Sequence, residues 1–151
     1  FQWFNDAEVC RYNGHAVFPI SQAAMKDFLA RTKASKEEVV LAICDKKTDA
    51  HLGNVAWQKI DTLTRSAEFA IVIGDRATWG KGVGAESAKL MVDYALTRLN
   101  LRRLHCGTHA DNKAMRKLAL TMGMKEEGVR KDAGFKDGKY HDIVLFGMVK
   151  E

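Results

Sequence analysis

The chain has 151 residues, of which 46% are hydrophobic and 28% are charged, and its net charge is +5. This length suits one domain with a core of its own, and the composition is that of a globular protein rather than a disordered or fibrous one. No run of about 18 apolar residues is present that would cross a bilayer, and no basic segment followed by an apolar run marks a signal peptide. We therefore expect a cytoplasmic protein without a membrane partner.

Neither metal binding nor nucleic-acid binding is favoured by the composition. Cys10, Cys44 and Cys106 are scattered, without the CxxC or Cys–His spacing of a metal site, so we expect reduced thiols and no metal. The basic residues are mixed with acids along most of the chain and form no run of five or more. We expect no nucleic-acid partner, and a polyanionic coenzyme accounts for the positive charge equally well.

The hydrophobic pattern changes period several times along the chain. After a helix remnant over residues 1–8 and a loop over 11–20, Ser21 can cap a helix. The turn signal Asp137-Gly138 joins the last two strands as a hairpin. In chain order the predicted elements are a helix over 22–32, strands over 39–45, 51–60 and 66–73, a helix over 84–100, a strand over 103–108, a helix over 113–122, and strands over 125–135 and 139–149.

The order of these elements predicts the sheet. A strand, a helix and a further strand around residues 84–100 imply a parallel pair with a right-handed crossover, whereas the hairpins imply antiparallel neighbours. The fold class is therefore α/β (α+β), with a mixed and mostly antiparallel sheet and helices on both faces.

A glycine-rich segment, Trp79-Gly80-Lys81-Gly82-Val83-Gly84-Ala85, lies between a predicted strand and a predicted helix. Glycine lets the main chain approach a ligand closely, and the first amides of a helix have no partner inside the helix. The helix dipole adds partial positive charge at the same place. The segment predicts a binding site for a diphosphate, with a plain tight turn as the alternative.

Two other phosphate-binding motifs fit this segment less well. The P-loop pattern GxxxxGK[ST] fails because Gly74 is one residue too far from Gly80, and because Gly82 stands where a hydroxyl must bind Mg²⁺. The dinucleotide pattern GxGxxG/A matches formally and ends at Ala85, but residues 94–110 contain no acid that could bind a ribose.

Five segments of the chain carry a family resemblance: Arg65-Ser66-Ala67-Glu68-Phe69, Trp79 to Gly84, Asn112-Lys113-Ala114, Gly123-Met124 and Phe135 to Asp142. With these segments, the region from Arg65 to Val149 resembles the core of the GNAT acetyltransferases, in the branch that includes ribosomal-protein N-terminal and spermidine acetyltransferases. The segment from Trp3 to Tyr12 resembles the first helix and following loop of this branch, and the family's usual first strand would precede Phe1.

The resemblance implies a single GNAT-like domain over residues 1–151, whose sheet splays between its two middle strands, and acetyl-CoA as cosubstrate. In the family motif Q/R-x-x-G-x-G/A, Trp79 replaces the Gln or Arg, while Gly82 and Gly84 are in place. The implied coenzyme-binding residues are Trp79, Gly80, Lys81, Gly82, Val83, Gly84 and Ala85 for the diphosphate, the main chain of Ile71, Val72 and Ile73 for the oxyanion and the pantetheine arm, Asn112 near the sulfur, and Arg116 and Lys117 near the phosphates. The alternatives are a plain helix cap at Asn112 and solvated charges at Arg116 and Lys117.

Catalysis requires a base, because an amine of pKa near 10 is almost wholly protonated at neutral pH. Glu68, on the strand beside the expected thioester, is the candidate catalytic residue, with a purely structural glutamate as the alternative. The family often has a tyrosine that protonates the leaving thiolate. Ala119 stands at that position, so water or another residue such as His109 would have to supply this proton.

The acceptor pocket is expected from residues 5–20, the 21–32 helix and the final hairpin. We expect an N-acetyltransferase that acts on a primary amine of a small molecule or a protein N-terminus, and the net charge favours an acidic acceptor such as a nucleotide-sugar over a polyamine. A non-catalytic acyl-CoA-binding or sensing module on the same fold is the alternative, and a homodimer is one assembly to consider. The candidate substrate-binding residues are Arg11, Tyr12, His15, Trp57 and Tyr140.

Overall fold

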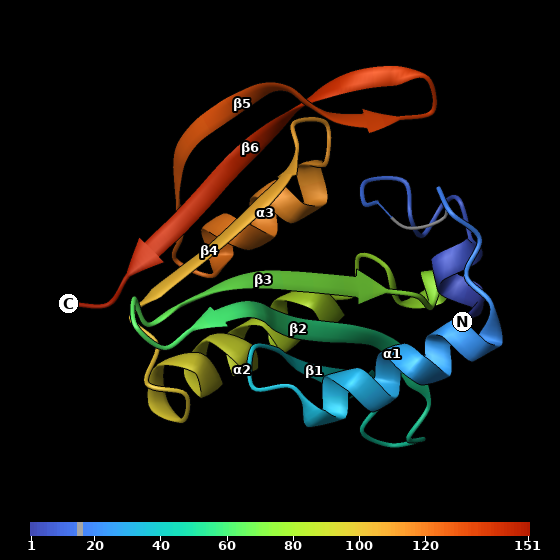
Figure 1. The fold of residues 1–151 in the computed structure, drawn as a ribbon, viewed down its shortest axis with the longest axis horizontal. Helices are drawn as coiled ribbons and strands as arrows, with labels where there is room; N and C mark the ends of the chain where they lie inside the picture. Colours follow the sequence, from blue (N-terminus) through green and yellow to red (C-terminus); the bar gives the residue numbers. More distant parts are fainter. Residues whose placement is uncertain (15–16) are drawn as a thin grey trace.

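The structure is a computed structural model that describes residues 1–14 and 17–151 (Figure 1). The strands predicted over 66–73 and 139–149 have those bounds, whereas the helix predicted over 84–100 ends at Thr97. In chain order the elements are η1 (Gln2–Asn5), α1 (Gln22–Ala34), β1 (Val39–Cys44), β2 (His51–Asp61), β3 (Ser66–Ile73), η2 (Arg76–Thr78), α2 (Val83–Thr97), β4 (Arg103–His109), α3 (Lys113–Thr121), β5 (Lys125–Lys136) and β6 (Lys139–Val149).

The helix predicted over residues 1–8 is wrong in extent. Only Gln2–Asn5 form a short 3₁₀ helix. Asp6 then takes an extended conformation, and its carboxylate accepts hydrogen bonds from the amides of Glu8 and Val9. An aspartate that bonds the main chain ahead of it favours a turn over a continued helix.

The six strands form one sheet in the order β1-β2-β3-β4-β6-β5. All neighbours are antiparallel except β3 and β4, which are parallel because α2 connects them. These two strands pair only between residues 66–68 and 103–105, and they part toward their C-terminal ends (Figure 1). We call the unpaired stretch beyond Glu68 and His105 the β3–β4 opening. The predicted splay between the two middle strands is confirmed.

Helices lie on both faces of the sheet, as predicted. In Figure 1, α2 and α3 lie behind the sheet and α1 lies in front of β1. The core lies between the sheet and α2, where Trp57 packs on Phe69 with ring centroids 5.3 Å apart and donates its indole N–H to the Met91 carbonyl over 2.8 Å. Burial of such a side chain contributes roughly 1.5–3 kcal/mol, so this face anchors the fold.

The opposite face of β4 carries polar side chains. Alternate residues of a strand face opposite sides, and Leu104 and Cys106 belong to the core on the helix side. His105, Gly107 and His109 therefore face the other side of the sheet, which we call the front face.

Candidate functional site

The glycine-rich turn connects η2 to the first residue of α2. Gly80 and Gly82 have φ values of +74° and +84°, a conformation that residues with side chains rarely adopt. An added Cβ at either position would meet no atom within 4 Å, so the space beside both glycines is open. The two glycines are therefore required by the turn, and they leave room for a ligand.

Most amides of this turn have no hydrogen-bond acceptor among the residues that the structure describes. The amide of Lys81 donates to the Thr78 carbonyl, and that of Glu86 donates to the Gly82 carbonyl as the first bond of α2. Between and beside them lies a row of amides for which the described part of the chain provides no acceptor, and which we call the open amides: those of Gly80, Gly82, Val83, Gly84 and Ala85. A row of open N–H groups at the positive end of a helix dipole suits an anion.

The segment between β3 and the turn is fixed by its own hydrogen bonds. Trp79 donates its indole N–H to the Ile73 carbonyl over 2.9 Å. Asp75 caps η2 by accepting from the Ala77 amide over 3.0 Å, and its carbonyl accepts from the Thr78 hydroxyl over 2.7 Å. These bonds hold the turn at the C-terminal end of β3.

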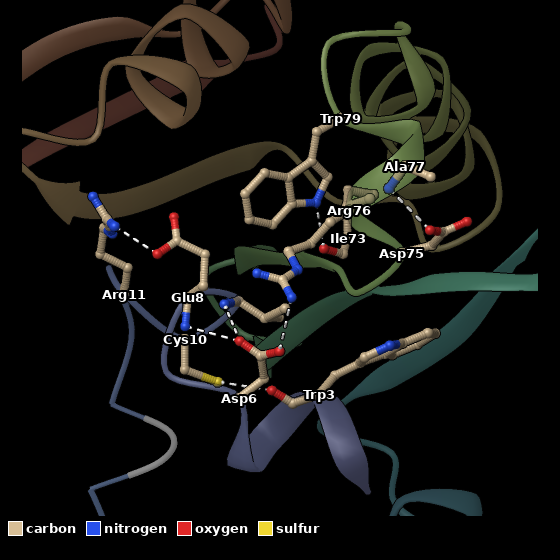
Figure 2. Close-up of polar contacts among 11 residues, drawn as sticks. Trp3, Asp6, Glu8, Cys10, Arg11, Ile73, Asp75, Arg76, Ala77 and Trp79 are labelled. Carbon is tan, nitrogen blue, oxygen red and sulfur yellow. Dashed lines mark hydrogen bonds and ion pairs between the residues drawn. The ribbon is translucent and has the colours of Figure 1, made fainter.

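The N-terminal segment packs against the same end of β3 (Figure 2). An added Cβ at Gly74 would overlap the indole of Trp3, so only glycine fits there. The Asp6 carboxylate lies 3.9 Å from the Arg76 guanidinium, and the Cys10 thiol donates to the Trp3 carbonyl over 3.2 Å. The predicted acceptor loop is thereby joined to the strand end that precedes the glycine-rich turn. The contacts of Trp3 with Gly74 and of Asp6 with Arg76 link residues about 70 positions apart in the sequence, and no local pattern indicated them.

A pocket of about 440 Å³ lies between this loop, the C-terminal end of β4 and the β5–β6 hairpin. We call it the front pocket. It includes two of the predicted acceptor residues, Arg11 and Tyr12. Its lining residues are Ala7, Glu8, Arg11, Tyr12, His109, Asp111, Lys136, Asp137, Lys139 and His141.

Of the other predicted acceptor residues, Trp57 and Tyr140 do not line this pocket. Trp57 is fully buried in the core, so its assignment to the acceptor site is wrong. Tyr140 is 68% exposed and pairs with Phe135 at 5.0 Å between ring centroids, beside the pocket rather than in its wall. His15 lies outside the described residues.

His109 occupies the inner wall of the front pocket and is only 9% exposed. Its ring stacks on His141 at 4.9 Å and meets the edge of Tyr12 at 6.2 Å. Burial lowers the pKa of His109, and His141 and Lys136 lower it further, while Asp111 opposes them. The imidazole is therefore neutral at physiological pH.

His141 completes this group of polar side chains. Its Nδ1 lies 3.5 Å from a carboxylate oxygen of Asp111. The buried Lys136 donates to the Asn13 carbonyl over 3.1 Å. Sequence reasoning did not bring His109 and His141 together, because 32 residues separate them. The alternation of His105 and His109 about Gly107 was the one available signal of a polar strand face.

Glu68 lies at the closed end of the β3–β4 opening. It is the last β3 residue paired with β4, opposite His105, and its carboxylate forms an ion pair with Lys59 at 2.6 Å. Burial lowers the pKa of His105, whereas the charge of Glu68 raises it. The carboxylate thus belongs to the front face but lies away from the front pocket.

Most polar groups predicted on α3 already have protein partners. Asn112 caps the helix by accepting from the Met115 amide over 3.1 Å, which agrees with the alternative interpretation of this residue. Arg116 donates to the Ala110 carbonyl over 3.2 Å and lies 3.6 Å from Glu126. Lys117 is exposed, and Ala119 is fully buried. Of the three predicted residues Asn112, Arg116 and Lys117, Lys117 is the one whose exposed side chain could reach a phosphate without breaking a bond to a described residue.

The comparison with protein families decides between the interpretations of this site. The model described as "Acetyltransferase (GNAT) domain" matches residues 1–125. The chain belongs to the GNAT acetyltransferase family. The predicted family, fold class and enzyme class are confirmed, and so is acetyl-CoA as cosubstrate. No helix among the described residues is long and apolar enough to cross a membrane.

Similar proteins include other acetyltransferases. An uncharacterized N-acetyltransferase, p20, from Bacillus licheniformis is 28% identical over 99% of this chain and 84% of its own length. The spermidine N(1)-acetyltransferase of Escherichia coli is 32% identical over 61% of this chain and 49% of its own length. The crystal structure of spermidine N-acetyltransferase from Vibrio cholerae in complex with CoA and spermine has a TM-score of 0.90 at 23% identity, over 98% of this chain and 86% of that one. At this identity the likeness concerns the fold.

Proposed function

We propose that this GNAT protein binds the diphosphate of acetyl-CoA on the open amides and transfers the acetyl group directly to a primary amine of a small molecule or a protein N-terminus. The observation that carries the proposal is the row of open amides at the start of α2, directly after the strand that borders the β3–β4 opening. A diphosphate placed there has the helix dipole and several N–H donors on one side. The pantetheine arm then extends into the opening.

The β3–β4 opening offers the main-chain groups that an extended arm needs. Beyond Glu68, β3 pairs only with β2, so alternate main-chain groups on its other side have no strand partner. In our proposal an N–H group of residues 71–73 donates to the thioester oxygen and stabilises the negative charge that develops there. Trp79 donates to the Ile73 carbonyl, and because the N–H and C=O of one strand residue point to the same side, we propose the Ile73 amide for this role.

A shallow, mainly apolar groove continues from the open amides between α2 and α3. Its lining includes Ala85, the last residue with an open amide, together with Lys89 and Met122. A flat aromatic base suits apolar walls of this kind, and a lysine suits a phosphate. We propose that the adenosine part of the coenzyme lies along this groove.

The acceptor approaches from the front pocket. The acetyl group moves when the amine nitrogen bonds to the thioester carbon, the C–S bond breaks and the CoA thiolate leaves. Glu68 remains our candidate base from the sequence, and it acts through water because it lies at the closed end of the opening. With alanine at position 119, the thiolate takes its proton from the amine that has just been acetylated.

The reducing cytoplasm suits the three free cysteines and is the proposed location.

The charges of the front pocket favour an acceptor that carries more than a positive charge. Three acids in its lining, Glu8, Asp111 and Asp137, are matched by Arg11, Lys136 and Lys139. Glu8 and Arg11 form an ion pair at 2.5 Å. Balanced charge supports an amine with acidic or hydroxyl groups, such as an amino sugar on a nucleotide, over a polyamine.

A non-catalytic acyl-CoA sensor is the second candidate, and Ala119 favours it because no hydroxyl stands where the family often has a tyrosine. Both candidates bind the coenzyme. Only the enzyme releases free thiol from acetyl-CoA when amines are supplied. Thiol release with a panel of amino sugars, amino acid amides, peptides and polyamines separates the two, and coenzyme binding without amine-dependent thiol release refutes acetyl transfer.

A further inference from the structure

We propose that the imidazole of His109 is the group that takes the proton directly from the acceptor's ammonium. The inference rests on the proposed acetyl transfer, and it assigns a catalytic residue on the acceptor side of the β3–β4 opening.

Along the strand direction, His109 lies as far from the paired end of β3 and β4 as the main-chain segment proposed to hold the thioester. The last recorded β3–β4 pair joins Glu68 to His105. His109 lies four residues further along β4, a distance of about 13 Å. Counting four residues along β3 places Val72 at the same level, in the middle of the main-chain segment proposed to hold the thioester. Glu68 lies at the closed end of the opening, four residues before Val72, where only a chain of waters would connect it to the amine.

The imidazole of His109 is largely buried, yet its ring nitrogens remain open to a ligand in the pocket. His109 is nine-tenths buried and lines the front pocket, yet no hydrogen bond to its ring nitrogens is formed within residues 1–14 and 17–151. Neither nitrogen is sealed from solvent. A side chain at Gly134 would come within 3.1 Å of Nε2, so the glycine keeps this nitrogen uncovered. An imidazole whose nitrogens open into the pocket and bond no described residue is available to a ligand there.

The groups that face the His109 imidazole come from four parts of the chain and influence its pKa. The groups that face His109 are Tyr12 from the N-terminal loop, Asp111 after β4, Lys136 from β5 and His141 from β6. Burial, His141 and Lys136 lower the pKa of His109, so the ring is ready to accept a proton at neutral pH. Burial and the nearby Lys136 would lower the pKa of an ammonium bound beside the ring in the same way and favour its deprotonation.

The proton and electron balance follows from this assignment. The ammonium R–NH₃⁺ gives one proton to His109 and becomes R–NH₂. Its lone pair forms the C–N bond to the thioester carbon, and collapse of the adduct breaks the C–S bond and releases the CoA thiolate. The nitrogen gives its second proton to the thiolate, which yields the amide and CoA–SH. Protonated His109 then passes its proton through water to Glu68 or to solvent.

The test compares ethylamine with trifluoroethylamine, two amines of similar size. At pH 7 the first is almost wholly protonated and the second almost wholly neutral, so only the first needs a base before it attacks. We expect His109→Gln to lower turnover with ethylamine by about 100-fold and with trifluoroethylamine by no more than about threefold, with unchanged affinity for CoA. His51→Gln, which replaces an imidazole outside the pocket, should leave both rates unchanged.

The pH profile gives a second readout. For the wild type with ethylamine, kcat/KM should fall as the pH drops through the lowered pKa of His109, below about 6.5, and this fall should disappear in His109→Gln. Added imidazole should restore part of the ethylamine rate in His109→Ala. Equal fractional losses with both amines, or a variant that keeps the acid limb, would refute the proposal. If the wild type releases no thiol with either amine or with any amine of the panel above, acetyl transfer itself fails and the assignment of His109 fails with it.

Discussion

Trp79 and Ile73 are joined by a hydrogen bond of 2.9 Å from the indole N–H to the main-chain carbonyl. The bond ties the first residue of the glycine-rich turn to the last residue of β3. Because Trp79 replaces the Gln or Arg of the family motif, this chain uses that position to fix the turn on the strand rather than to contribute a long polar side chain.

Trp79→Phe removes this bond and keeps an aromatic ring. A neutral hydrogen bond contributes about 1 kcal/mol, so we expect the affinity for CoA to weaken about fivefold, with little change in melting temperature because Trp79 is 42% exposed. Titration calorimetry with CoA and a melting curve check this. An unchanged dissociation constant would show that the turn keeps its place without the bond.

Gly82→Ala and Gly84→Ala form a matched pair within the turn. Alanine at Gly82 must adopt φ of +84°, which costs roughly 1–2 kcal/mol, and its Cβ would enter the space that we propose for the diphosphate. Alanine at Gly84 makes only ordinary contacts, at 3.9 Å from Leu118 and 4.0 Å from Ile71, inside the first turn of α2. We expect Gly82→Ala to lower both stability and CoA affinity, the latter at least tenfold, and Gly84→Ala to keep or raise stability. Melting curves and calorimetry distinguish the two, and equal behaviour would contradict the assigned strain.

Glu68→Gln tests the carboxylate at the closed end of the opening. We expect turnover at neutral pH to fall about tenfold, less than in His109→Gln, while CoA affinity is kept, because the carboxylate acts through water. Lys59→Met is the control, since it removes the ion-pair partner and keeps the acid. Steady-state kinetics over a range of pH decide the matter. The assignment is lost if Glu68→Gln retains both the wild-type turnover and the wild-type pH profile.

The elements that the sequence predicted well are those with a strong period or a clear terminus. The strand over 66–73 alternates buried and less buried residues in its first half, where Ala67 and Phe69 are buried, and Asp137-Gly138 fixes the hairpin between β5 and β6, with positive φ at both residues. The glycine-rich turn was also predictable, because the same glycines that permit its shape leave the amides open. Local residue chemistry determines each of these features.

The parts that could not be predicted depend on contacts between distant segments. Tryptophan is a residue type that often lines ligand sites, but the burial of Trp57 follows from the register of β2 on β3 and from the position of α2. His109 and His141 meet only because β6 returns beside β4. The extent of the N-terminal helix depends on the hydrogen bonds of Asp6. Tertiary packing decides each of these outcomes, and a single sequence does not reveal it.

The cysteines should differ widely in reactivity. Burial raises the pKa of Cys106 to about 12, and burial also raises the pKa of Cys10, whereas Cys44 is exposed. Because the thiolate is the reactive form, iodoacetamide at neutral pH should modify Cys44 first and leave Cys106 unmodified in the folded protein. Peptide mass spectrometry after a time course checks this, with urea-unfolded protein as the control. Early labelling of Cys106 would contradict the burial of β4.

Binding of the coenzyme diphosphate to the open amides can be followed residue by residue in an NMR titration of the ¹⁵N-labelled protein with CoA. We expect the largest shifts on the amides of Gly80, Gly82, Val83, Gly84 and Ala85, and smaller shifts for Lys81 and Glu86, whose amides are already bonded. Saturable binding of CoA that leaves the open amides unshifted would contradict this binding mode.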